Sequence, residues 1–142
     1  MSGLSAFFSQ NAVKQENQKY VASKRFLDEN KNPIEWEVCS ISEMENEALR
    51  RECTRKVPVP GRKNMFQSEV NYDKYLGKLA VKCTVYPNLY DKELQDTYSA
   101  MGAEELLKVM LTSGEYSNYL EKIQEINGFD TTMEDLVEEV KN

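Results

Sequence analysis

The residues that could carry out acid–base or nucleophilic chemistry are unevenly represented in this chain of 142 residues. It contains no histidine, which is the commonest general base, the usual partner of a Cys or Ser nucleophile and a frequent zinc ligand. Carboxylates are abundant, for example Glu104 beside Glu105 and Glu138 beside Glu139. A glycosidase needs two carboxylates facing each other, whereas adjacent residues of a helix point to different sides. We therefore interpret these pairs as helix-dipole partners or solvated surface, and predict no catalytic residues.

Three cysteines and one small basic cluster are the remaining candidates for binding a metal or a phosphate. Cys39, Cys53 and Cys83 lie too far apart in sequence for a Cys-x-x-Cys zinc knuckle, and their apolar neighbours favour buried packing residues. Arg62 and Lys63 supply two positive charges in a loop. Two charges are too few to bind a nucleic-acid backbone, because the rest of the chain is acidic and repels its phosphates. We predict no metal site, no cofactor and no nucleic-acid partner.

Methionine and tyrosine side chains point to a binding surface instead. Flexible Met beside amphipathic Tyr is typical of surfaces that accept varied apolar partners. The same residues at helical spacing also fill a core, so we expect most to be buried and a minority to line a groove. Two phenylalanines in the N-terminal arm are further candidates. The predicted partner-binding residues are Phe7, Phe8, Tyr90, Tyr98, Met101, Met110, Tyr116 and Tyr119.

Composition and charge are those of one soluble globular domain. Hydrophobic residues make up 40% of the chain and charged residues 30%, with a net charge of -6. Residues 1–60 are electrically balanced, and the whole negative excess lies in residues 61–142. This excess indicates either a solvated helical face or an acidic surface that steers basic partners.

The same features bear on membranes and compartment. No apolar run approaches the roughly twenty residues that a membrane span needs. The cysteine number is odd, and the first residues lack the basic start and apolar core of a signal peptide. We therefore predict no membrane association and a reducing cytoplasm.

Capping signals divide the C-terminal half into short amphipathic helices. Asp91 is a predicted N-cap for a helix that ends at Gly102, because Asp accepts first-turn amides and Gly tolerates the left-handed conformation of a helix end. Gly128 is predicted to end a later helix. The capping boxes that begin the last two predicted helices are Thr112 with Glu115 and Thr131 with Glu134.

The N-terminal half contains the only clear β pattern. Residues 20–27 and 34–41 are predicted to be the strands of a hairpin, with Trp36 pointing into the core. Glu35 and Glu37 would then face outward and pair with Lys24 or Arg25. Isolated hairpins are marginal, so helices must cover this one.

Two longer helices follow the predicted hairpin. Ser42 and Glu45 form a capping box for a helix through about Lys56. The Pro-rich stretch VPVPGRKNMFQS is predicted to be a loop, and a central helix is expected from about Asn71 to Tyr86. The fold class is therefore α+β and predominantly helical, with the hairpin of about 20–41 packed on four or five short helices within 42–142. A single globular domain would cover 20–142, after an N-terminal arm of 1–19 with a short helix.

Several segments together resemble the XkdN-like phage tail assembly chaperone family of tailed phages, defective prophages and tail-like particles of Gram-positive bacteria. The resemblance covers nearly the whole chain and depends on the order and spacing of its pieces. They are KRFLDENKNPIEWEV, VPVPG, VYPNL, ELQDTYSAMGAEELL, EINGFD and MEDLVEEVKN.

The resemblance implies a non-enzymatic assembly factor in the cytoplasm of the host bacterium. Such a protein is expected to bind the tape measure protein, hold it soluble until tail tube subunits polymerise around it, and be absent from the mature tail. The tail tube protein is a possible further partner. A structural subunit of a tail or tail-like particle is the alternative, and the oligomeric state is left open.

Overall fold

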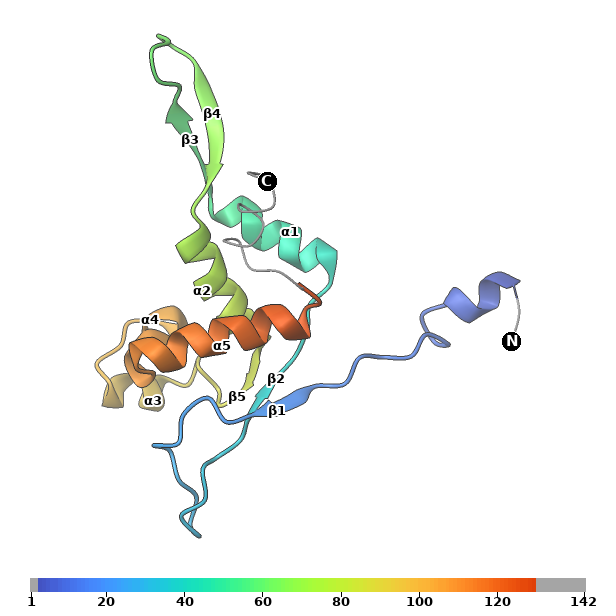
Figure 1. The fold of residues 1–142 in the computed structure, drawn as a ribbon, viewed down its shortest axis with the longest axis vertical. Helices are drawn as coiled ribbons and strands as arrows, with labels where there is room; N and C mark the ends of the chain where they lie inside the picture. The colour runs from blue at the N-terminus through green and yellow to red at the C-terminus, as the bar shows by residue number, and fades with distance from the viewer. Residues whose placement is uncertain (1–2, 130–142) are drawn as a thin grey trace, which may run out of the picture.

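The computed structural model describes residues 3–129, which form an α+β fold with more helix than strand (Figure 1). A 3₁₀ helix, η1, precedes two small antiparallel sheets and a group of α-helices. The strands are β1 (Gln18–Tyr20), β2 (Trp36–Val38), β3 (Thr54–Pro58), β4 (Phe66–Val70) and β5 (Thr84–Tyr86). The helices are η1 (Gly3–Phe7), α1 (Glu43–Glu52), α2 (Tyr72–Cys83), α3 (Lys92–Thr97), α4 (Ala103–Met110) and α5 (Ser113–Ile126).

The helix starts predicted at Ser42, Asp91 and Thr112 are confirmed. The Ser42 Oγ of α1 accepts the Glu45 amide at 3.2 Å, and the Glu45 carboxylate accepts the Ser42 amide at 3.2 Å. The same reciprocal pair joins Thr112 and Glu115 at the start of α5. Asp91 caps α3 by accepting the Leu94 amide at 2.9 Å. Each contact satisfies an amide that has no partner within its own helix.

The predicted helix ends were wrong in three places. Helix α1 ends at Glu52 because the following residues join β3, and α2 ends at Cys83 because β5 pairs with β2. Helix α3 ends at Thr97, well before Gly102, whose φ of +106° lies at the start of α4 instead. In the first two cases strand pairing overrode local helical preference. The helix predicted to begin at Thr131 lies outside the described residues.

The first sheet has the strand order β1-β2-β5. Trp36 lies opposite Tyr20, so the ladder of β1 and β2 covers the outer ends of the predicted hairpin, and a single bridge joins Leu27 and Pro33 beside the turn. Residues 21–35 are mostly loop, and the strands predicted over 20–27 and 34–41 were therefore too long. Part of the cause is local, because the Asp28 carboxylate accepts the amides of Asn30 and Asn32 at 2.9 Å and holds a turn.

This register changes the predicted ion pairs of the sheet. Glu37 lies opposite Lys19 and binds its ammonium at 2.7 Å, instead of pairing with Lys24 or Arg25. Arg25 reaches helix α5, where its guanidinium contacts the Glu115 carboxylate at 2.8 Å. Thus Arg25 links the loop of residues 21–35 to the helices.

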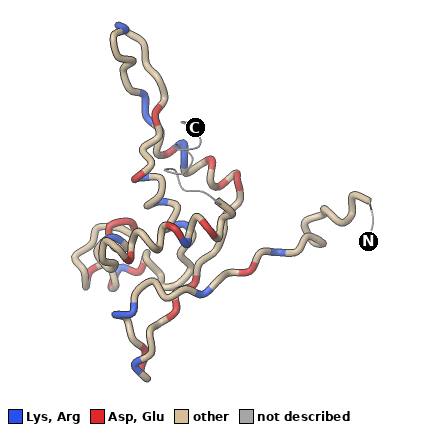
Figure 2. The backbone as a smooth tube through the Cα atoms, in the orientation of Figure 1, with Lys and Arg blue, Asp and Glu red and all other residues tan. Residues whose placement is uncertain are grey.

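The segment that we predicted to be a loop contains a second hairpin. Strands β3 and β4 pair in register from Thr54 with Val70 to Pro58 with Phe66. Pro58 is tolerated because it ends a strand of a two-stranded ribbon. The hairpin projects from the body of the molecule (Figure 1), and Lys and Arg residues mark its base and its tip (Figure 2).

The core lies between the first sheet and helices α2, α4 and α5. Trp36 is only 1% exposed, which confirms that it points inward, and its ring packs edge-on against Tyr119 with centroids 5.3 Å apart. Leu79, Leu106 and Ile123 are equally well buried. Helix α1 joins this core through Asn46, whose buried amide oxygen accepts the Tyr75 hydroxyl of α2.

The N-terminal segment extends away from the helices (Figure 1). None of the five residues of η1 is buried. The segment contacts the body where Gln15 Nε2 donates to the carbonyl of Ile126 at 2.9 Å. Strand β1 begins at Gln18, so the end of the predicted arm already belongs to the sheet.

Candidate partner-binding surface

The N-terminal arm presents apolar side chains to solvent. Phe7 is 81% exposed and Phe8 is half exposed, and Leu4 and Val13 on the same arm are also exposed. Large apolar groups that gather without cover mark contact sites more often than isolated ones do. The arm therefore remains a candidate for partner contact.

Two of the predicted partner-binding residues belong to the core. Met110 closes α4 and is 5% exposed, and Tyr119 of α5 is fully buried. The Tyr119 hydroxyl forms a hydrogen bond of 2.6 Å with Thr84 Oγ1, and burial raises the pKa of this phenol well above its ordinary value. Both residues are part of the apolar helix faces, so their inclusion in a surface was wrong.

Two further predicted residues are half-buried. Tyr98 caps the end of α3 and packs on the core. Tyr116 of α5 packs across α2, where its hydroxyl oxygen would lie 3.4 Å from a Cβ added at Gly77. Burial raises the pKa of the Tyr116 phenol. Each side chain is therefore only partly accessible to a partner.

Tyr90 and Met101 are the exposed members of the predicted set in the C-terminal half. Tyr90 lies between β5 and α3, and Met101, which is 90% exposed, lies between α3 and α4. Tyr90 lines a hollow of about 220 Å³, Met101 lines one of about 600 Å³, and Glu104 lines both. We call these two residues and the hollows beside them the Tyr90–Met101 surface.

The floor and rim of the Tyr90–Met101 surface come from several elements. Leu49 of α1 and Val81 of α2 supply apolar floor beside Tyr90. Lys78 donates to the Glu104 carboxylate at 2.8 Å, and this hydrogen bond raises the pKa of the ammonium. The surface therefore combines an apolar floor with charges of both signs, as grooves for amphipathic helices do.

Sequence reasoning missed Leu49, Val81 and Lys78. In the sequence these residues are marked only by their positions on the apolar face of α1 and α2 or at its boundary. Such positions are occupied by core residues and groove residues alike. Figure 1 shows η1 and the α3–α4 region on opposite sides of the molecule. The structure thus brings Tyr90 and Met101 to neighbouring hollows and keeps Phe7 and Phe8 apart from them.

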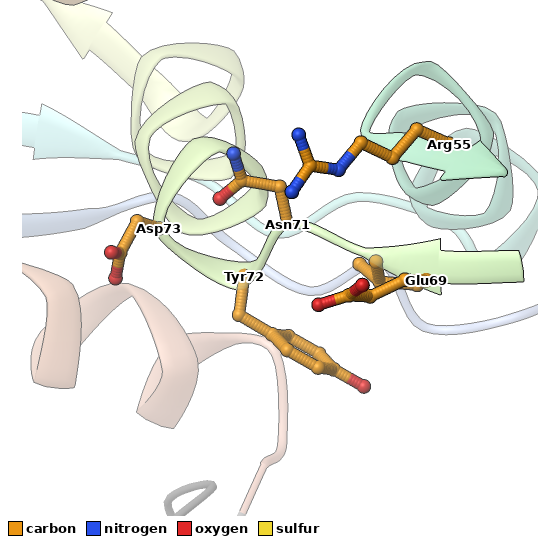
Figure 3. Close-up of a pocket in the computed structure, with 6 residues that line it drawn as sticks. Arg55, Glu69, Asn71, Tyr72 and Asp73 are labelled. Carbon is orange, nitrogen blue, oxygen red and sulfur yellow. The ribbon is translucent and has the colours of Figure 1, made fainter. Parts of the chain in front are cut away.

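A third hollow of about 290 Å³ lies at the base of the second hairpin (Figure 3). Arg55 and Glu69 come from its two strands, and Tyr72 and Asp73 begin α2. Asn71 caps that helix by accepting the Lys74 amide at 3.2 Å. These residues position the hairpin on α2, and no nucleophile with an adjacent base lies among them.

Comparison with known proteins identifies the family. The family model for phage XkdN-like tail assembly chaperone proteins matches residues 4–141. The chain belongs to this family. Its helices, its two sheets and the Tyr90–Met101 surface are therefore features of an XkdN-like chain.

Two relatives from Bacillus subtilis (strain 168) match almost the full length. YqbN is 36% identical and the XkdN protein of the phage-like element PBSX is 34% identical, each over 140 residues. Both alignments cover 98% of this chain and 93% of the relative. The crystal structure of YqbN superposes with a TM-score of 0.76 at 30% identity, covering 92% of this chain and 99% of that one.

The family and the side chains of residues 3–129 both bear on catalysis and metal binding. The XkdN-like family is one of assembly chaperones rather than a known enzyme family. Within the described part of the chain no His, Cys, Asp or Glu residues cluster as they would around a metal ion. Burial raises the pKa of the Cys83 thiol to about 11 and raises that of Cys53 as well, which disfavours the reactive thiolate. None of the helices in this part is long and apolar enough to cross a bilayer.

Proposed function

We propose that this chain is a tail assembly chaperone that binds the tape measure protein and keeps it soluble until tail tube subunits polymerise around it. Membership of the XkdN-like family over residues 4–141 supports the chaperone role. The observation that carries the client-binding role is the Tyr90–Met101 surface, because two large side chains remain exposed beside hollows that combine apolar and charged lining residues.

The form of this surface suits an amphipathic helical client. An apolar side chain of the client would enter a hollow, and its flanking charges would meet Lys78, Glu104 and their neighbours on the rim. Met101 can change rotamer to fit different side chains, and Tyr90 combines an apolar ring with a polar tip. Contacts of this kind tolerate sequence variation along a long client.

Weak individual contacts also permit release. Burying one large apolar side chain contributes roughly 1.5–3 kcal/mol before the cost of ordering the client. A chaperone that makes only a few such contacts per site yields to a partner that packs over a larger area. The tail tube protein, the proposed second partner, would displace the chaperone in this way.

The site of action follows from this cycle. Tape measure protein and chaperone meet in the cytoplasm of the host bacterium, where the client is synthesised. The chaperone leaves as the tube grows and is absent from the mature tail.

Coexpression with the tape measure protein of the same phage or prophage tests the proposal. The client should move from the insoluble to the soluble fraction and copurify with the chaperone, and an unrelated acidic protein of similar size should not replace it. A client that remains insoluble, or does not copurify, would contradict the proposal. High copy number of this chain in purified particles would instead identify a structural subunit.

A further inference from the structure

The second hairpin is a separate basic unit in an acidic chain. Residues 54–70, which we call the basic hairpin, contain four cations and the single carboxylate of Glu69, a net charge of +3. The remaining residues of the chain together carry -9. The four cations are Arg55, Lys56, Arg62 and Lys63.

These cations have no ion-pair partner among residues 3–129. Eight of the other thirteen Lys and Arg residues in that range do form ion pairs, so the hairpin differs from the rest of the molecule. Arg62 Nη1 contacts only the Met65 sulfur, at 3.9 Å. Charges left unpaired on a projecting element remain available to a partner.

An apolar group accompanies the charges. Phe66 is 62% exposed and lies opposite Pro58, two residues along β3 from Lys56, so these side chains share one face of the ribbon. Neither β3 nor β4 has a second strand beside it in the described residues. The face therefore offers cationic and apolar contacts together.

The complementary charge lies elsewhere in the same chain. Residues 91–129, which contain α3, α4 and α5, carry eight carboxylates and three lysines, a net charge of -5. Residues 3–53 carry a net charge of -2 and residues 71–90 carry +2, so these two ranges together contribute no net charge. Within 91–129, Glu104 and Glu105 line the 600 Å³ hollow next to Met101.

The hairpin cannot reach this acidic region in its own chain. Figures 1 and 2 show it projecting away from α3 and α4, with basic residues at its tip. The acidic region of another copy has no such restriction. A nucleic acid is a poorer partner, because the rest of the chain would repel its phosphates.

We propose that the basic hairpin of one copy docks on the acidic helices α3–α5 of a second copy, head to tail. The cations meet the carboxylates of residues 91–129, and Phe66 enters the hollow beside Met101. This contact joins two different surfaces and so allows chains of more than two copies. Because this hollow belongs to the Tyr90–Met101 surface, a second copy and the proposed client would compete for it, and self-association is therefore measured without the client.

Charge reversal in the hairpin tests the proposal. The variant Lys56→Glu, Arg62→Glu and Lys63→Glu is compared with the wild type by sedimentation velocity over a range of concentrations at low salt. The matched control, Lys14→Glu, Lys24→Glu and Lys31→Glu, reverses three exposed unpaired lysines and gives the same net charge. Circular dichroism and thermal melting establish that all three proteins are folded.

The wild type and the control should self-associate. The association constant of the hairpin variant should be lower by a factor of about ten or more, as expected for the loss of several exposed charge contacts. Salt at about 0.5 M should dissociate the wild type, because it screens exposed charges. Mixing the hairpin variant with the wild type should restore complexes, because the acidic helices of the variant still accept a wild-type hairpin.

Three results would overturn the proposal. The first is a wild type that stays monomeric at all concentrations, and the second is a control variant that dissociates as much as the hairpin variant. The third is self-association that survives hairpin reversal. A monomeric wild type whose hairpin variant loses the tape measure protein in coexpression would assign the hairpin to client binding instead.

Discussion

At the scale of single residues, Trp36 joins the small sheet to the helices. Its buried ring contacts Tyr119 of α5 and lies 6.4 Å from Phe26, between centroids. Trp36→Ala should lower the free energy of unfolding by about 3–5 kcal/mol, because a large cavity would open in the core. Denaturant titration measures this loss. The control Met44→Ala, at a position of α1 that is 82% exposed, should change stability by no more than about 0.5 kcal/mol. A comparably small loss for Trp36→Ala would contradict the packing described.

The cysteines give a second prediction at this scale. Burial raises the pKa of all three thiols, and the most enclosed, Cys83, reaches about 11. Alkylation of the native protein at neutral pH should therefore be slow, with the partly exposed Cys39 reacting before Cys53 and Cys83. Mass spectrometry after timed labelling checks the order. Replacing all three with Ala should leave client solubilisation intact. Loss of activity in a folded triple variant would indicate a redox or metal role.

The limits of sequence reasoning are visible in individual side chains. The inward position of Trp36 followed from its alternation with glutamates. Tyr119 and Met101 belong to residue types that serve cores and contact surfaces equally, so their types could not separate them. Burial depends on how helices from distant parts of the chain pack, and this decided that Tyr119 is core and Met101 is surface.

At the scale of elements, the start of α5 is the best-defined junction of the fold. The Glu115 carboxylate accepts the guanidinium of Arg25 at 2.8 Å and the Thr112 amide at 2.9 Å. The Arg25 hydrogen bond and the capping contact lower the pKa of Glu115 from 4.5 to about 2. The same arginine donates to the Met110 carbonyl at 2.6 Å, so it holds the loop of residues 21–35 on the α4–α5 corner.

This junction predicts a pH dependence of stability. Because the folded-state pKa of Glu115 is lowered, the unfolded chain binds the extra proton, and the stabilisation is complete above pH 4.5 and lost as pH falls toward 2. The melting temperature of the wild type should therefore exceed that of Glu115→Gln at neutral pH. This difference in melting temperature should shrink as the pH falls from 4.5 toward 2. Arg25→Gln removes the partner of Glu115. In a protein that carries Arg25→Gln, adding Glu115→Gln should therefore lower the melting temperature at neutral pH by less than it does in the wild type. A gap between wild type and Glu115→Gln that stays constant from pH 6 to pH 2 would contradict this assignment.

Helix starts were predictable from sequence because their signals are local. A Ser, Thr or Asp side chain caps an amide two or three residues away, whatever the rest of the fold does. The strands β3, β4 and β5 were missed because a strand is stabilised by a partner strand and by side-chain packing more than by its own sequence. The Pro-rich composition of residues 57–60 also concealed the hairpin. Proline lacks an amide donor, and it is tolerated here because each strand of a two-stranded ribbon has one unpaired edge.

At the scale of the whole molecule, the fold separates surfaces that the sequence lists together. The N-terminal arm, the α3–α4 region and the basic hairpin occupy different sides of the body (Figure 1). Charge counting located the acidic excess in residues 61–142, but its division after residue 60 cut through the basic hairpin. Only the chain path shows that these opposite charges are held apart within one molecule, so that they can meet only between two copies.

The central claim is that the Tyr90–Met101 surface holds the tape measure protein in solution. The decisive measurement is the soluble fraction of that client when it is coexpressed with the variant Tyr90→Ser and Met101→Ser. Met44→Ser provides the control, because Met44 is 82% exposed on α1 and lies outside both hollows. We predict that the double variant melts like the wild type and loses most of the soluble client, while the control retains it. Full client solubility with a folded double variant would contradict the account.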